Sequence, residues 1–176
     1  RTPSSPSPRS LPPSMPCSGS SLVRRIGLVA LALLGVPLSA HAQKMSLPAE
    51  SQVPLLLKVL TYDRQFEVRA APEVVVGIVY VAGDPDSQAA AEEVGQTFYK
   101  FAGKTVKKLP LKYVMVEYRS AAEVEKLLKD KGIKVLYVTP GNSKNLGELV
   151  KIAQANGLTS ATGVPDYVKK GIAIGV

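Results

Sequence analysis

Residues that commonly carry catalytic chemistry are scarce in this chain of 176 residues. Its one cysteine, Cys17, and its one histidine, His41, both lie among the first 42 residues. The rest of the sequence therefore has no residues for Ser-His-Asp or Cys-His sites, or for zinc sites built from cysteine or histidine. No phosphate-binding glycine loop follows an expected strand, and no pair of acids has a spacing typical of acid–base catalysis. We expect a protein that is not an enzyme and that holds neither a cofactor nor a metal.

One group of polar residues is unusual enough to be a candidate binding surface. Tyr62, Asp63 and Arg64 follow one another after an apolar stretch. Tyrosine and arginine are the residue types that most often anchor protein interfaces, which favours a surface for a protein partner. The alternative interpretation is an ion pair at a helix end, with the tyrosine packed over it.

The other candidate binding residues lie in a part of the chain where strands and helices are expected to alternate. Residues 74–81 (VVVGIVYV) form a continuous β-branched run, typical of a strand buried on both faces. Further strands are expected over 113–118, 133–139 and 158–162, separated by amphipathic helices. A helix is also expected ahead of them, from Val53 to about Arg64, with Pro54 in its first turn. The sequence therefore predicts a three-layer, doubly wound, mostly parallel α/β sheet of Rossmann-like type, preceded by a short amino-terminal helix.

Four candidate residues stand where these strands are expected to end. Asp84 follows the first strand, Thr139 the third and Thr162 the fourth, and Tyr167 lies in the loop after the fourth. Sheets of this type bind ligands at the carboxyl ends of their strands, where the strand order reverses. Tight turns and helix caps need the same residue types, so a structural role and a binding role both remain open.

The distribution of charge argues against a nucleic-acid partner. The whole chain has a net charge of +8, but removal of the first 42 residues takes away four arginines and no acid, which leaves 18 − 14 = +4. The lysine-rich run 104–112 (KTVKKLPLK) has no arginine and no interleaved aromatic residue, so we interpret it as a solvated loop before a strand.

The amino-terminal part of the chain has the features of a secretory signal. Residues 1–21 are rich in proline and serine and are expected to lie outside any domain. In residues 22–42 a cationic stretch precedes an apolar run of about 13 residues, against the roughly 20 that a bilayer requires. Small residues follow, so cleavage is expected between Ala42 and Gln43. The mature protein would be periplasmic, without an integral membrane span, and would consist of a polar lead-in (43–51) and one domain (52–176).

Several stretches resemble the YfiR-like family of periplasmic proteins. They are VPLLLKVLTYDR (53–64), VVVGIVYV (74–81), VLYVTP (135–140) and LTSATGVPDYVKKGIAIGV (158–176). The resemblance implies a regulator that docks on the periplasmic sensor domain of an inner-membrane signalling protein, either a diguanylate cyclase of cyclic-di-GMP signalling or a sensor kinase. A homodimer is also kept open. Family members with paired cysteines differ from this chain, and a Gly-Gly pair common in the family is Lys170-Gly171 here.

A second resemblance is to one lobe of an ABC-type solute-binding protein. It rests on GIVYVAGDPDSQAAAEEV (77–94), VLYVTPGNSKNLGELVKIA (135–153) and VKKGIAIGV (168–176). It implies capture of a small molecule for transport, although such proteins need two lobes to close around a ligand. In either family the chain continues beyond the last apolar run. We therefore expect residues 171–176 to form an edge strand that is unprotected or poorly covered, in a domain truncated at its carboxyl end.

Overall fold

The computed structural model describes residues 44–176 of the chain. The expected leader, signal peptide and cleavage site after Ala42 lie outside the described residues. The helices are α1 (Ala49–Tyr62), α2 (Phe66–Ala70), α3 (Pro85–Lys100), α4 (Ala121–Asp130), α5 (Leu146–Ala155) and α6 (Pro165–Val168), with a 3-10 turn η1 (Asn142–Lys144). The strands are β1 (Val74–Val81), β2 (Thr105–Val106), β3 (Leu109–Tyr118), β4 (Val135–Val138), β5 (Thr159–Thr162) and β6 (Ile174–Gly175).

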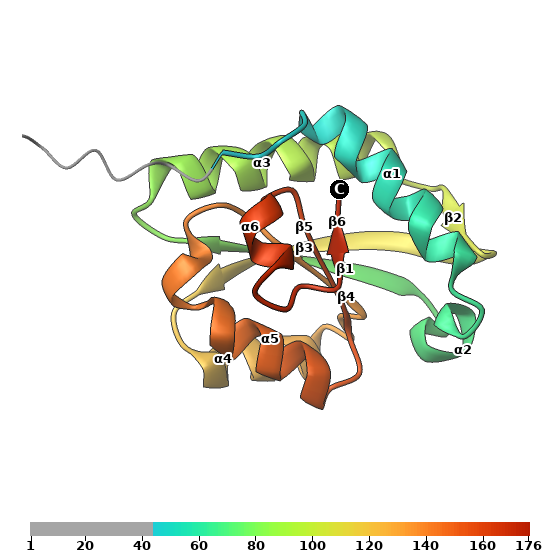
Figure 1. Ribbon diagram of the computed structural model, residues 1–176. Coiled ribbons are helices and arrows are strands. Elements are labelled where there is room, and N and C mark those ends of the chain that lie inside the picture. Colours follow the sequence, from blue (N-terminus) through green and yellow to red (C-terminus); the bar gives the residue numbers. More distant parts are fainter. Residues whose placement is uncertain (1–43) are drawn as a thin grey trace, which may run out of the picture. The chain divides into compact units, whose positions relative to one another are not determined.

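These strands form one sheet in the order β2-β3-β1-β4-β5-β6. Every pair is parallel except the short hairpin of β2 with β3. Helices α1 and α3 cover one face of the sheet, and α4 and α5 cover the other (Figure 1). The predicted doubly wound, mostly parallel α/β fold with a preceding helix is thus confirmed.

Strand β1 lies at the centre of this arrangement because its side chains are apolar on both sides. Val76 and Ile78 pack in the core under α1 and α3, while Val75 and Val79 pack in the core under α4 and α5. A continuous β-branched run is what a strand between two helical layers requires. The burial of both faces explains why this strand was the clearest in the sequence.

The helix that follows β1 begins where its capping residues predict. The Asp84 side chain accepts a hydrogen bond from the Ser87 backbone N–H at 3.0 Å, and Pro85 occupies the first turn. Ser120 caps α4 in the same way, accepting from the Glu123 N–H at 3.3 Å. The acid or hydroxyl ahead of each helix satisfies backbone donors that the helix itself cannot pair.

The first helix starts earlier than expected. It begins at Ala49 instead of Val53, so that Pro54 lies inside it. The polar Gln52 is fully buried, and its side-chain oxygen accepts a hydrogen bond from the Tyr137 hydroxyl of β4. A tertiary contact of a polar side chain thus extends the helix into a stretch that looked like a polar lead-in.

The lysine-rich run is not a loop, contrary to our interpretation. It forms the β2–β3 hairpin, in which Val106 pairs with Leu109 across a two-residue turn. The two turn residues, Lys107 and Lys108, have φ angles of 48° and 69°. This is the geometry of a tight hairpin turn, which usually carries Asn-Gly, so the usual turn signal was missing. Burial of Val106 and Leu111 holds the hairpin against the core.

The last apolar run forms a shorter strand than expected. Strand β6 consists of two residues that pair with β5 at the edge of the sheet. Ile172 and Val176, on either side of it, are buried in the two cores. The position at an edge is as predicted, and the strand itself is poorly covered, since Ile174 is half-buried and Gly175 is exposed.

Candidate functional site

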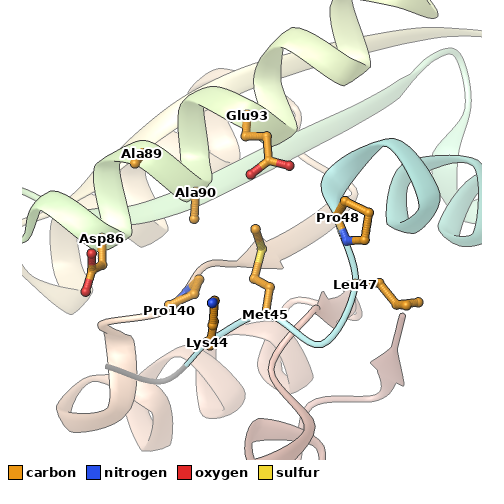
Figure 2. A pocket seen from close by; sticks show the side chains of 9 residues that line it. All are labelled: Lys44, Met45, Leu47, Pro48, Asp86, Ala89, Ala90, Glu93 and Pro140. Atoms are coloured by element: carbon orange, nitrogen blue, oxygen red, sulfur yellow. The ribbon is translucent and has the colours of Figure 1, made fainter. Parts of the chain in front are cut away.

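A cavity of about 600 Å³ opens at the carboxyl end of the sheet, between residues 44–48 and helix α3 (Figure 2). We call it the strand-end cavity. The chain leaves β1 for β3 on one side and later returns to β4 on the other, so the strand order reverses between β1 and β4. Pro140 lies two residues after the end of β4 and lines the cavity together with the first turns of α3. The cavity therefore lies at the point where doubly wound sheets bind ligands.

The amino-terminal segment, residues 44–48, forms one wall of the cavity because it is bonded across the strand ends. The Ser46 backbone N–H donates to the Gly163 carbonyl oxygen at 3.0 Å, just after β5. From α1, the Gln52 side-chain amide donates to the Leu47 carbonyl oxygen. A side chain at position 163 would collide with the Gln52 amide, so a glycine is needed for this close approach.

The lining combines apolar surface with three charged side chains. Ala89 and Ala90 of α3 leave room beside Met45 of the amino-terminal segment. The charged residues are Lys44, Asp86 and Glu93, and the Glu93 carboxylate points into the space (Figure 2). One Glu93 oxygen, Oε1, accepts from the Ala49 N–H at 3.1 Å and so anchors the start of α1. Such a lining suits a small amphipathic molecule with a charged group.

Behind the cavity, a buried hydroxyl network ties the strand ends together. Ser87 Oγ accepts from the Val81 N–H at 3.0 Å and lies 3.0 Å from Thr139 Oγ1. Thr139 Oγ1 donates to the Val79 carbonyl oxygen at 2.8 Å. Ser87 must then donate to Thr139, which satisfies both hydroxyl groups. The network locks the ends of β1 and β4 to the first turn of α3.

Asn142 extends this network into the turn η1. It is fully buried, and its amide nitrogen donates to the Thr139 carbonyl oxygen at 3.1 Å and to that of Val79 at 3.3 Å. Its side-chain oxygen has no hydrogen-bond partner among the residues that the structure describes. The amide donors fix the direction of this side chain.

Asp84 is placed at the carboxyl end of the sheet as predicted, but it acts as a helix cap. Its carboxylate is half-buried against the turn after β4, where a β-carbon at position 141 would lie 2.5 Å from Asp84 Oδ2. Gly141 also has a φ of 85°, which favours glycine. The acid at this position therefore contributes to the joint between β1 and β4.

Thr139, Thr162 and Tyr167 come together at the same end of the sheet, but all three are fully buried. The Thr162 hydroxyl donates to the Val138 carbonyl oxygen at 2.8 Å and accepts from the Val164 N–H at 3.1 Å. The Tyr167 hydroxyl lies 3.3 Å from Ser143 Oγ, and burial raises the pKa of this tyrosine. These residues hold the strand ends in place and do not line the cavity.

The group Tyr62, Asp63 and Arg64 lies at the other end of the sheet, close to where β3 begins. Lys107 of the hairpin donates to the Asp63 carbonyl oxygen, and the Asp63 carboxylate forms an ion pair with Arg69 of α2. A helix-end ion pair thus exists, but it does not involve Arg64. Tyr62 is 72% exposed and so is not packed over it.

The residues that line the cavity were missed in the sequence. The signal that could have indicated them is the pair Ala89-Ala90 between the acids Asp86 and Glu93, since these four share adjacent turns of α3. The docking of the amino-terminal segment depends on contacts with distant residues and has no local signal.

No family model matches the sequence, and no curated protein does. The YfiR-like resemblance therefore stays a prediction. Similar solved structures include substrate-binding proteins of ABC transporters. One is a fatty acid ABC transporter substrate-binding protein from Thermomonospora curvata, with 14% identity and a TM-score of 0.45 over 65% of this chain and 26% of that one. Another is a sugar-binding protein from Bacillus halodurans, with 13% identity and a TM-score of 0.46 over 70% and 42%.

A third is a substrate-binding protein with adhesive properties from Clostridium difficile, with 21% identity and a TM-score of 0.40 over 61% of this chain and 35% of that one. The chain thus spans between 26% and 42% of the length of these three neighbours. Within residues 44–176, no helix is both long enough and apolar enough to cross a membrane.

Proposed function

We propose that this chain is a non-enzymatic, periplasmic binding module that takes a small amphipathic solute in the strand-end cavity, as one lobe of a solute-binding protein. The observation that carries the proposal is the position of this cavity of about 600 Å³ at the reversal of strand order between β1 and β4. Cavities of this size at such a point are typical small-molecule sites. A second lobe would close over the solute from the open side.

The charges of the lining narrow the class of solute. Asp86 and Glu93 stand about two turns apart on α3, with Ala89 and Ala90 between them. Two carboxylates beside apolar surface favour an ammonium group on an apolar body, and Lys44 offers a partner for a carboxylate. The solutes that fit best are free amino acids with apolar side chains and small amines.

Calorimetric titration of the chain with leucine, putrescine and hexanoate tests the proposal. Leucine or putrescine should bind, and Ala89→Phe should weaken that binding by at least about tenfold because the ring occupies the cavity. Gln88→Phe is the matched control, since Gln88 is an exposed neighbour that does not line the cavity. Absence of binding by both leucine and putrescine, or equal binding by Ala89→Phe, would contradict the proposal.

A second candidate function is docking on a membrane signalling protein, as the YfiR-like resemblance implies. It is favoured by the corner between α1 and α2, where Tyr62 is 72% and Val68 is 83% exposed. Large apolar side chains exposed together are typical of protein interfaces. Here the cavity would be incidental, and the partner would be held by the corner.

Capture of purified periplasmic sensor domains of diguanylate cyclases and sensor kinases separates the two functions. A docking protein should lose capture in the double variant Tyr62→Ser, Val68→Ser and keep it in Ala89→Phe. A solute-binding lobe should instead lose solute binding in Ala89→Phe and keep it in the double variant, as measured by calorimetry. Capture that survives the double variant would exclude the α1–α2 corner as the docking surface.

A further inference from the structure

The outer side of β3 is open along most of its length. Strand β2 pairs only with Leu109 and Pro110, and the Leu111 N–H donates to the Lys104 carbonyl oxygen at 3.2 Å. From residue 112 to residue 118, β3 is paired with β1 on its inner side, and no strand of the described residues lies on its outer side. We call residues 112–118 the β3 edge.

The direction of the Leu111 N–H shows which backbone groups of this edge point outward. Alternate residues of a strand direct their N–H and C=O to the same side, so Tyr113, Met115 and Glu117 also point outward. Natural edges are usually protected by charges, by proline or by a very short strand. Here Lys112 stands at one end and Glu117 next to the other, and the four residues between them carry no charge.

Exposed apolar side chains accompany this open backbone. A groove of about 450 Å³ runs between β3 and the outer flank of α3, lined by Tyr99, Tyr113 and Met115 among others. Tyr99 is 70% and Met115 is 39% exposed. A β-carbon on Gly95 would lie 3.4 Å from Met115 Sδ, so the middle of α3 stands directly over the middle of the edge.

We propose that the β3 edge is a homodimer interface, in which a second copy of this chain adds its own β3 in antiparallel orientation. The twofold axis passes beside Met115, so that Met115 faces its equivalent and Tyr113 faces Glu117 of the other copy. Each facing pair is formed by residues whose backbone groups point outward, as the closely bonded pairs of an antiparallel ladder require. On the opposite face Val114 meets Val116, and the two sheets become one.

The charges on α3 favour a second copy over an unrelated strand. Glu92 and Lys100 both line the groove, one on each side of Gly95, and lie about 12 Å apart along the helix. Because the axis passes near the middle of α3, Glu92 of each copy comes opposite Lys100 of the other. Lys100 also pairs with Glu50 at 2.5 Å, but both side chains are mostly exposed and free to exchange partners.

The position of α3 is compatible with this arrangement. Helix α3 packs on both β1 and β3, so its axis stands about one strand spacing from the twofold axis. The two copies of α3 would then be roughly 10 Å apart, which is the usual distance between packed helices. Tyr99 and Gln96 would fill the space between them.

Sedimentation equilibrium of the full chain tests the interface. The chain should form a dimer that dissociates on dilution, and Met115→Lys should raise the dissociation constant by at least about tenfold, because it places two like charges on the axis. Leu55→Lys is the matched control, since Leu55 on α1 is 42% exposed and lies outside the proposed interface. It should leave the dissociation constant unchanged.

A charge exchange between Glu92 and Lys100 tests the interface even if one single variant is poorly folded. Glu92→Lys alone should weaken the dimer, and the double variant Glu92→Lys, Lys100→Glu should restore it. In amide hydrogen exchange, the N–H groups of Tyr113, Met115 and Glu117 should be protected at high concentration and lose protection on dilution. A monomer at every concentration, or a dimer unaffected by Met115→Lys, would overturn the proposal.

Discussion

The two lateral edges of the sheet are held in opposite ways. At one side, β3 pairs with β1 over eight residues and leaves its outer side open beyond Leu111. At the other side, β6 pairs with β5 through two residues only. The first edge is firmly anchored but long, and the second is weakly anchored but short. Anchoring and exposure of an edge strand are therefore separate properties.

Each edge is protected to a different degree. The chain around β6 is tied down by the Val176 N–H, which donates to the Thr162 carbonyl oxygen at 3.0 Å, and by the Ala173 N–H, which donates to Ser160 Oγ at 3.0 Å. A strand of two residues offers little backbone to a partner. The hairpin with β2 covers β3 only as far as Leu111, so the β3 edge is the more available of the two for strand pairing.

The largest difference between the edges should appear in truncations of apolar side chains. Val116 of β3 is fully buried under α4, whereas Ile174 of β6 is only half-buried. We expect Val116→Ala to lower the free energy of unfolding by about 2 to 3 kcal/mol and Ile174→Ala to lower it by about 1 kcal/mol. Urea denaturation of both variants measures the two costs. Equal costs would show that β6 is anchored as firmly as β3.

The strands themselves were largely predictable, but not their order in space. The run 74–81 follows from local chemistry, and the structure confirms it as a strand. The caps at Asp84 and Ser120 are equally local, since each side chain accepts from a backbone N–H three residues further on. The order β2-β3-β1-β4-β5-β6 follows from crossover connections that leave no local signal. The sequence therefore predicted residues 171–176 as an open edge and gave no sign that β3 forms a longer one.

The sequence predicted where the candidate site lies, but not which residues line it. Strand ends were expected to gather Asp84, Thr139, Thr162 and Tyr167, and they do. Buried hydroxyl groups at strand ends form hydrogen bonds with the backbone and are then not free to bind a ligand. The sequence alone does not reveal which hydroxyl groups are buried. The cavity lining depends instead on the docking of residues 44–48, which is a tertiary event.

A smaller effect is expected at the hairpin turn that precedes β3. Lys108 has a φ of 69°, a conformation that costs a non-glycine residue roughly 1 kcal/mol. Lys108→Gly should therefore raise the free energy of unfolding by about 0.5 to 1 kcal/mol. Lys107→Gly is the matched comparison. It should raise the free energy of unfolding by less, because it also removes the hydrogen bond from the Lys107 side chain to the Asp63 carbonyl oxygen. Denaturation of the two variants in parallel tests the order.

The smallest effect concerns the far end of the same edge, where Tyr118 closes β3. Its hydroxyl donates to the Glu148 carboxylate of α5. Burial, and secondly this carboxylate, raises the pKa of Tyr118 from 10 to about 12. Because the folded pKa lies above the ordinary one, protonated Tyr118 contributes its stability fully below pH 10, and this contribution is lost as the pH rises through about 12.

Absorbance of tyrosinate after a rapid pH jump measures this shift. Near pH 11, between the ordinary and the raised pKa, the native chain and Tyr118→Phe should give nearly equal absorbance, since Tyr118 is still mostly protonated. Glu148→Gln should give more absorbance at the same pH, because the carboxylate no longer opposes ionisation, although burial still does. If Glu148→Gln matches the native chain, burial alone raises the pKa of Tyr118, and the Glu148 carboxylate does not hold the end of the β3 edge.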